Sequence, residues 1–255
     1  MEANLVEMFS SVQGEGPYVG TSTLFVRFGA CDLRCRWCDS PHTWRPARRA
    51  RFETSRGSGI FVEHANPVAL ETLFEAAERL DVAAHRFVSL TGGEPLLQPE
   101  AVASVAKQLR SRGSRIHLET HGLATEALER VIDQIDLVCM DWKLASDVCF
   151  ADETRSGEVF DTLHEDFLRI ARQAPEVIVK VVVTPASTDA EIDALAQRVA
   201  AISPEIPLIL QPVTPTKHVP ERPSAERLLA LTTHLERRLR DVRLIPQTHP
   251  IYGAL

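Results

Sequence analysis

The sequence lacks long apolar runs, an excess of positive charge and a secretory leader. Its 255 residues contain no uninterrupted apolar stretch of about 18 residues, so no membrane span is expected. The formal net charge of −7 argues against nucleic acid as a partner. The first residues, MEANLVEMFSS, are acidic and have no long apolar segment, unlike a signal peptide. We therefore expect a cytoplasmic protein.

Cysteine is scarce, and its distribution is uneven. Of the five cysteines, Cys31, Cys35 and Cys38 follow one another in the spacing C-x3-C-x2-C. Because thiols stay reduced in the cytoplasm, this cluster indicates metal ligands or catalysts rather than disulfides. The other two, Cys139 and Cys149, have no partner at ligand spacing and are expected to be small core residues.

The cluster has no fourth thiol, and this leaves two interpretations open. Structural zinc takes four protein ligands, and His42 is near enough in the sequence to be the fourth. An iron–sulfur cubane also normally takes four cysteines. With three, one iron keeps an open position for an outside ligand, as open-site metal catalysis requires.

Short β-rich apolar runs alternate with helical patterns along the chain. The predicted strands cover 22–29, 86–90, 115–119, 136–141, 176–184, 207–212 and 242–246. Strands that alternate with helices indicate a parallel sheet, and this number of units favours a full or partial barrel. We therefore predict one α/β domain over residues 1–255, a partial or modified (β/α) barrel of the TIM type.

Polar and glycine-containing motifs follow these predicted strands. They are the cysteine loop, TGGEP (91–95), ETHG (119–122), DWK (141–143), TPAST (184–188), QPVTP (211–215) and PQTHP (246–250). Any one of them is typical of an ordinary turn. Together they indicate a shared site, because the carboxyl ends of parallel barrel strands lie on one face.

The segment 45–59 departs from this pattern. It contains five arginines and no apolar period, so we predict an exposed loop insertion. The arginines are Arg45, Arg48, Arg49, Arg51 and Arg56. Such a loop can be a solvated elaboration without a role. Alternatively, its positive charge beside the cysteine loop steers an acidic electron donor such as flavodoxin.

The cysteine spacing, with the aromatic Trp37 directly before Cys38, resembles the signature of the radical S-adenosylmethionine (SAM) superfamily. The resemblance implies that the three thiols bind a [4Fe-4S] cluster and that SAM chelates the fourth iron. TGGEP looks like the superfamily's GGE motif at the methionine end of SAM. Independently of the family, Gly92 and Gly93 let the backbone approach a ligand closely, and Glu94 can balance an ammonium.

The stretch SVQGEGPYVG, residues 11–20, further resembles the start of the 7-carboxy-7-deazaguanine synthase family. Arg27 matches the family arginine that pairs with the substrate carboxylate, a contact that a guanidinium makes in bidentate fashion. The resemblance implies a lyase of queuosine biosynthesis. A 5′-deoxyadenosyl radical removes hydrogen from C6 of 6-carboxy-5,6,7,8-tetrahydropterin, whose ring then contracts to 7-carboxy-7-deazaguanine with loss of ammonia. It also implies a homodimer.

The resemblance implies roles for individual residues, none of them a side-chain acid or base. Residues expected to contact SAM are Trp37, Cys38, Asp39, Gly93, Glu94, Glu119, Thr120, His121, Asp141, Trp142 and Lys143. Residues expected to contact the pterin are Val12, Gln13, Gly14, Glu15, Arg27, Thr91, Gln211 and Thr214. Ser40 stands where the family commonly has threonine as a Mg²⁺ ligand, and its hydroxyl preserves that chemistry.

Two other functions compete with this interpretation. A glycyl-radical-enzyme activating protein also carries C-x3-C-x2-C, but it acts on a large protein, whereas the Q-G-E-G element and Arg27 favour a small acid. A zinc-stabilised binding module would use the three cysteines with His42. Zinc spacing does not account for TGGEP or for the motifs at the strand ends.

Overall fold

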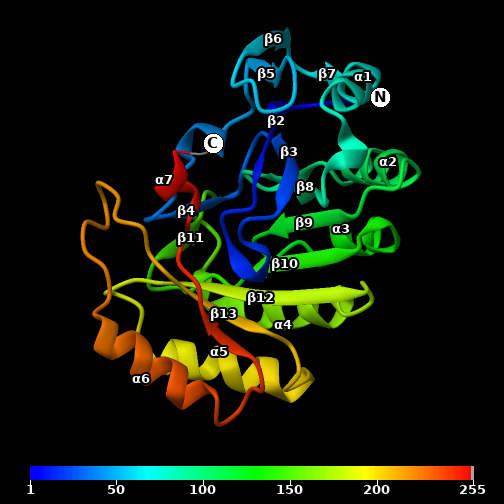
Figure 1. The fold of residues 1–255 in the computed structure, drawn as a ribbon. Coiled ribbons are helices and arrows are strands. Elements are labelled where there is room, and N and C mark those ends of the chain that lie inside the picture. Colours follow the sequence, from blue (N-terminus) through cyan, green and yellow to red (C-terminus); the bar gives the residue numbers. More distant parts are fainter. Residues whose placement is uncertain (254–255) are drawn as a thin grey trace.

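The computed structural model describes residues 1–253 and contains a ten-stranded mixed sheet in the order β14-β13-β12-β10-β9-β8-β3-β2-β5-β6. The sheet curves into an open barrel with the helices on its outer side (Figure 1). Its strands are β2 (Leu5–Val12), β3 (Ser22–Phe28), β5 (Arg49–Glu53), β6 (Phe61–Ala65), β8 (Phe87–Gly92), β9 (Ile116–Thr120), β10 (Leu137–Asp141), β12 (Glu176–Val183), β13 (Leu208–Pro212) and β14 (Val242–Leu244). Two small sheets pair β1 (Glu2–Ala3) with β7 (Val68–Ala69) and β4 (Leu33–Cys35) with β11 (Val148–Phe150).

The helices cover the outer face of the sheet. They are α1 (Leu70–Arg79), α2 (Pro99–Arg110), α3 (Thr125–Glu129), α4 (Phe160–Ala171), α5 (Asp189–Ile202) and α6 (Ala225–Leu235). The short α7 (His249–Tyr252) lies instead in the carboxyl-terminal tail beside the cavity, which His249 lines. α2 shows why: Val102, Val105 and Leu109 recur at helical spacing and are fully buried, and proline at its first position needs no hydrogen-bond donor. Among residues 1–253, no helix has the length and apolar character that a membrane crossing requires.

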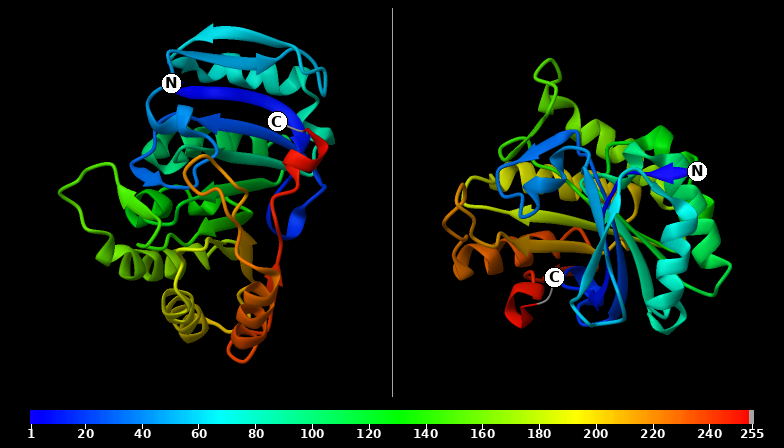
Figure 2. Two further views of the ribbon diagram at one scale, coloured as in Figure 1. Left: turned by 90° about the vertical axis from the view of Figure 1, so that its left-hand side faces the viewer. Right: turned by 90° about the horizontal axis from the view of Figure 1, so that it is seen from above.

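Seven neighbouring strands, from β3 through β8, β9, β10, β12 and β13 to β14, are all parallel. They are the seven strands that the sequence predicts, and their ends differ from the prediction by at most two residues. The predicted α/β partial barrel is therefore confirmed. Figure 2 shows this parallel half with α4, α5 and α6 against it and the amino-terminal strands at the opposite edge.

The amino-terminal strands extend this barrel in a way that the sequence analysis did not predict. β2 pairs antiparallel with β3, β5 pairs parallel with β2, and β6 pairs antiparallel with β5. The prediction of an exposed loop over 45–59 is therefore wrong for Arg49–Glu53. Ala50 and Phe52 of this strand are buried, which fixes its register against β2.

The strand register decides which side chains meet inside the barrel. Because side chains alternate between the two faces of a strand, residues paired across the sheet share a face. The pairs Arg27–Thr91 and Asp141–Lys180 place charged and polar side chains of neighbouring strands on one face, and Gln211, paired with Val182, shares this face.

Candidate active site

One cavity of about 370 Å³ is formed on the inner face, toward the carboxyl ends of the parallel strands. Most of the predicted site residues line it. They are Val12, Gln13, Gly14, Glu15, Arg27, Cys31, Cys35, Trp37, Cys38, Asp39, Ser40, Thr91, Gly93, Glu119, Thr120, His121, Asp141, Lys143 and Gln211. The shared site inferred from the strand-end motifs is therefore present as a single space, although the roles given to individual residues stay predictions.

Glu94 does not line this cavity. Its side chain is 0% exposed and both carboxylate oxygens are engaged inside the protein. Oε1 accepts hydrogen bonds from the Leu96 amide (2.9 Å) and the Thr120 hydroxyl (2.8 Å), and Oε2 accepts one from the His121 amide (2.8 Å). As placed, Glu94 fixes the backbone of the neighbouring ETHG loop, and its contact with the ammonium group of SAM stays a prediction.

Trp142 and Thr214 also lie outside the lining of the cavity. Trp142 is buried, its Nε1 donates to Asp161 (3.1 Å), and its ring stacks on His164 with 4.8 Å between the centroids. Side chains alternate between the two sides of an extended chain, so Asp141 and Lys143 face the cavity and Trp142 between them faces the core.

The three clustered cysteines line the cavity as neutral thiols. Burial raises the pKa of Cys31 and of Cys35 to about 12, and it also raises the pKa of Cys38. Metal ligation requires the thiolate, so a bound cation has to displace these protons. Cys139 is buried as expected, whereas Cys149 is exposed, and its prediction as a core residue is wrong.

A central network of alternating charges crosses the floor of the cavity. We define it as Glu15, Lys180, Asp141 and Lys143. The Lys180 ammonium lies 2.6 Å from Glu15 Oε2 and 3.1 Å from Asp141 Oδ2, and the Lys143 ammonium lies 2.8 Å from the same Asp141 oxygen. Lys143 Nζ also lies 4.5 Å from the centroid of the Trp37 ring, beside the cluster loop.

These mutual contacts outweigh burial in setting the ionisation of the network. Burial alone would lower the pKa of Lys180, but Asp141 and Glu15 hold that pKa well above its usual value. Burial alone would raise the pKa of Asp141, but Lys143 and Lys180 lower it. For Glu15, Lys180 and Gln247 likewise overcome burial and lower the pKa. All four members of the network are therefore charged near neutral pH.

Lys180 is a site residue that was not predicted from the sequence, although a signal was present. It is the one charged residue inside the otherwise apolar run VIVKVVV of β12. A charge in a buried parallel strand needs a partner, and such a residue is a site candidate for that reason.

Glu119 lies between the two expected halves of the site. Its Oε1 accepts hydrogen bonds from Gln13 Nε2 (3.0 Å) and from the Ser89 hydroxyl (2.5 Å). Gln13 in turn accepts a hydrogen bond from the Glu15 amide through its Oε1 (3.1 Å). The resemblance assigns Glu119 to SAM and Gln13 to the pterin, and the structure joins them directly.

The carboxyl-terminal tail returns to the Q-G-E-G loop, and its Gln247 and His249 line the cavity. Gln247 Nε2 donates to Glu15 Oε1 (2.6 Å) and to Asp39 Oδ2 (3.0 Å), and the Thr248 amide donates to the Gly14 carbonyl (2.9 Å). A Cβ on Gly14 would lie 2.6 Å from the His249 imidazole, so only glycine allows this approach. The tail residues 254–255 lie outside the described residues.

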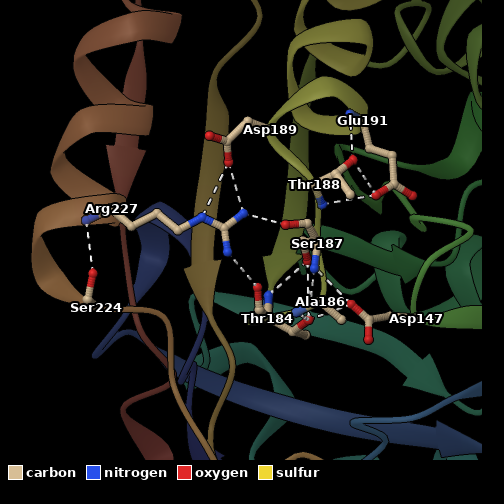
Figure 3. A network of polar contacts seen from close by, with 9 residues as sticks. All are labelled: Asp147, Thr184, Ala186, Ser187, Thr188, Asp189, Glu191, Ser224 and Arg227. Carbon is tan, nitrogen blue, oxygen red and sulfur yellow. Dashed lines mark hydrogen bonds and ion pairs between the residues drawn. The ribbon is translucent and has the colours of Figure 1, made fainter.

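The TPAST motif does not line the cavity but supports the cysteine loop through Asp147. The Asp147 carboxylate accepts a hydrogen bond from the Thr184 hydroxyl (2.6 Å) and pairs with Arg36 of the cysteine loop (3.3 Å). Arg227 of α6 donates to the carbonyl oxygens of Thr184 (3.2 Å) and Ser187 and so holds the turn from the other side. Figure 3 shows this arrangement from Asp147 to Arg227.

Comparisons with known proteins agree with this geometry. The model of the Radical SAM superfamily matches residues 25–199. The 7-carboxy-7-deazaguanine synthase of Geobacter sulfurreducens is 37% identical, over 99% of this chain and 98% of that protein. The protein of the same name from Methanothermobacter thermautotrophicus is 31% identical, again over 99% of this chain and 98% of that protein.

The chain belongs to the 7-carboxy-7-deazaguanine synthase family of the Radical SAM superfamily. Solved structures agree on the fold. The crystal structure of QueE from Escherichia coli superimposes with a TM-score of 0.66 at 22% identity, covering 98% of this chain and 95% of that one. The structure of TYW1 with a lysine-pyruvate adduct gives a TM-score of 0.55 at 12% identity, over 85% of this chain and 74% of that one.

The residues of this radical SAM enzyme fit the groups that its family implies. The three thiols share one cavity, as a [4Fe-4S] cluster with an open iron requires. Asp141 Oδ1 and Gln211 Oε1 are buried and have no hydrogen-bond partner in the described part of the chain, so a ligand with donors would satisfy them. A Cβ on Gly93 would lie 2.1 Å from the Ala30 carbonyl, which fixes the backbone beside the cluster loop.

Single-ion sites are less evident. Among residues 1–253, no three His, Cys, Asp or Glu side chains are grouped closely enough to hold one metal ion. Ser40 lines the cavity, and its hydroxyl donates to Asp39 Oδ1 (3.0 Å). The two oxygens are of the kind that Mg²⁺ binds, and Ser40 as its ligand stays a prediction.

Proposed function

We propose that this protein converts 6-carboxy-5,6,7,8-tetrahydropterin to 7-carboxy-7-deazaguanine with loss of ammonia, a step toward queuosine. The observation that supports this function best is that the three thiols, the Q-G-E-G loop and Arg27 line the same cavity. Membership of the Radical SAM superfamily alone would leave the substrate open, whereas an arginine and a Q-G-E-G loop in the cluster cavity suit a small acid.

When bound, the cluster and SAM supply one-electron reduction and hydrogen abstraction, chemistry that no side chain provides. The protein's own residues bind, orient and exclude water. Arg27 presents its terminal nitrogens to the substrate carboxylate. Gln13 offers its amide to the pterin edge, and Glu119, which Gln13 contacts, offers its carboxylate to SAM. The central network keeps an ordered set of charges on the floor of the cavity.

Further assignments accompany this proposal. We propose that Ser40 binds Mg²⁺ at the substrate carboxylate, that the protein forms a homodimer, and that it works in the cytoplasm, where its thiols stay reduced. We also propose that an acidic electron donor such as flavodoxin is steered by only part of the arginine-rich segment 45–59. Arg49, Arg51 and Arg56 each pair with a carboxylate, which leaves Arg45 and Arg48 as the candidates for steering. Turnover with flavodoxin by Arg45→Ala/Arg48→Ala should respond less to added salt than wild-type turnover.

The decisive experiment is product analysis after anaerobic reconstitution. Protein with iron and sulfide is incubated with SAM, dithionite and the tetrahydropterin, and the products are identified by mass spectrometry. We expect 7-carboxy-7-deazaguanine, and we expect Cys35→Ala to yield neither this product nor 5′-deoxyadenosine. If the wild type forms 5′-deoxyadenosine but leaves the pterin unchanged, the substrate assignment is wrong while the superfamily chemistry stands.

A further inference from the structure

Three charged residues lie side by side across three strands at one edge of the cavity. In the register of the sheet, Glu7 of β2 is paired with Arg27 of β3 on one side and with Arg51 of β5 on the other. Glu7 Oε1 accepts from Arg27 Nε (2.8 Å), and Glu7 Oε2 accepts from Arg51 Nε (2.8 Å) and Nη2 (2.6 Å). We call these three residues the edge triad.

Burial differs sharply within the edge triad. The Glu7 side chain is 6% exposed, the Arg27 side chain 18% and the Arg51 side chain 47%. Arg51 is held from its other side by Phe61 of β6, whose ring centroid lies 4.6 Å from the guanidinium carbon. All three side chains therefore share one face of the sheet: Arg51 lies half-exposed toward its edge, Glu7 is buried between the two arginines, and Arg27 lines the cavity.

Each carboxylate oxygen of Glu7 accepts from a different arginine, and this leaves part of the Arg27 guanidinium free for a ligand. Only Nε of Arg27 contacts Glu7, so Nη1 and Nη2 have no protein acceptor among residues 1–253 and remain available to a ligand. Two guanidiniums and one carboxylate also leave one net positive charge at this edge. Without Arg51, Glu7 and Arg27 would cancel each other, and the buried Oε2 of Glu7 would need a new donor. Arg27 could supply it by turning into a bidentate pair, which would withdraw Nη from the cavity.

We propose that Arg51 is a positioning residue that, through Glu7, keeps Arg27 aimed at a carboxylate ligand and keeps the net charge of the edge triad positive. This inference rests on the proposed function, because it assumes that Arg27 receives the pterin carboxylate. It assigns a role to a side chain in a segment that the sequence presents as a solvated loop. Specificity for the acid is then set partly by a residue that never touches it.

The test compares two inert ligands that differ in one charge. Binding of 6-carboxypterin and of pterin, which lacks the carboxylate, is measured on the reconstituted holoenzyme with SAM. In Arg51→Gln we expect the Kd of 6-carboxypterin to rise about tenfold, equivalent to about 1.4 kcal/mol. The Kd of pterin should stay within about twofold of the wild type. In turnover the KM for the tetrahydropterin should rise with little change in kcat, because ground-state and transition-state binding are lost together.

Two further variants separate positioning from a general structural effect. Arg49→Gln is the matched control, because Arg49 lies two residues away on the same strand and its ion pair is with the exposed Glu63. It should bind both ligands as the wild type does. Glu7→Gln/Arg51→Gln removes one charge of each sign, restores the net charge to Arg27 alone, and should recover most of the preference for 6-carboxypterin.

The outcomes that overturn the proposal are specific. Equal weakening of both ligands by Arg51→Gln would indicate a merely structural role, and unchanged binding of both would indicate none. Failure of the double variant to recover the preference would contradict the charge argument. If the wild type itself does not prefer 6-carboxypterin over pterin, the proposed function is wrong. The wild type alone gives this result, so it is distinguished from a failure of the proposal for Arg51.

Discussion

The cavity is bordered by two charged networks that differ in burial. The central network lies on the floor of the barrel, where its lysines have side chains exposed by only 7% and 9%. The edge triad begins at a comparably buried carboxylate, but it ends at Arg51, which is half in water. Both networks alternate in sign, so the pattern of charge is the same and only the surroundings differ.

This difference teaches which network holds the fold and which tunes binding. A charged side chain in the central network has little contact with water. Removing its partner therefore leaves a poorly solvated charge, which lowers the free energy of unfolding strongly. At the edge, water can replace part of a lost partner, and the cost falls toward that of a surface pair. Mutations in the centre should therefore act on stability and activity together, whereas mutations at the edge should act mainly on ligand preference.

The largest effect is expected for Lys180→Met. Glu15 and Asp141 would then face each other across the floor without the ammonium between them. We expect a loss of about 3–5 kcal/mol in the free energy of unfolding and loss of turnover. Urea denaturation of the apoprotein measures the first and product formation the second. Lys107→Met, the same change on the exposed face of α2, is the control and should stay within about 0.5 kcal/mol of the wild type.

The central network should also respond to pH in a predictable direction. Glu15 and Asp141 have lowered pKa values in the folded chain, because their lysine contacts outweigh burial. The stability that they contribute is complete above their ordinary pKa of about 4 and is lost as the pH falls through the lowered values. In Lys180→Met burial and the mutual repulsion of Glu15 and Asp141 are no longer offset by Lys180, so these carboxyl groups take up protons at a higher pH. The gap in unfolding free energy between the wild type and Lys180→Met should therefore be largest near pH 8 and should narrow as the pH falls. A gap that is unchanged at pH 3 would contradict this.

A smaller effect is expected for Asp147→Ala, which has features of both networks. The Asp147 carboxylate is buried, as the central network is, whereas its partner Arg36 is about half exposed, as Arg51 of the edge triad is. We expect a loss of about 2 kcal/mol, because the hydroxyl of Thr184 and the guanidinium of Arg36 both lose an acceptor. The cysteine loop should loosen, so the reconstituted variant should release iron to a chelator faster than the wild type. Asp166→Ala, on the exposed side of α4, should not change either measurement.

The contrast between the networks also explains how far the sequence could predict the site. Strand ends and cysteine spacing are local patterns, and for that reason the parallel strands and most of the cavity lining could be predicted. The pairing of Glu7 with Arg51 depends on which strands become neighbours, information that no local period carries. Alternation in the segment RARFE, residues 49–53, was nevertheless visible, since Ala50 and Phe52 recur at period 2. Five arginines in a short range obscured it.

Burial of polar groups was the other information missing from the sequence. Glu94 sits in a motif typical of ligand binding, yet its carboxylate holds backbone and hydroxyl groups of the adjacent loop. Lys180 sits in an apolar strand typical of core, yet it lines the cavity. In both cases the side chain's partner lies far away in the sequence, and only the assembled barrel brings the two together.

The smallest effect is expected for the ion pair between Arg49 and Glu63, which lies entirely on the edge side of the comparison. The two side chains are 67% and 64% exposed, and their closest atoms are 3.2 Å apart. A double-mutant cycle with Arg49→Gln and Glu63→Gln should give a coupling free energy below about 0.5 kcal/mol, and added salt should reduce it further. The corresponding cycle of Arg51→Gln with Glu7→Gln should give a larger value, because Glu7 is buried. Equal coupling free energies in the two cycles would show that the burial of Glu7 does not make its pair with Arg51 stronger than the exposed pair of Arg49 with Glu63. Burial would then not explain the different roles proposed for the two networks.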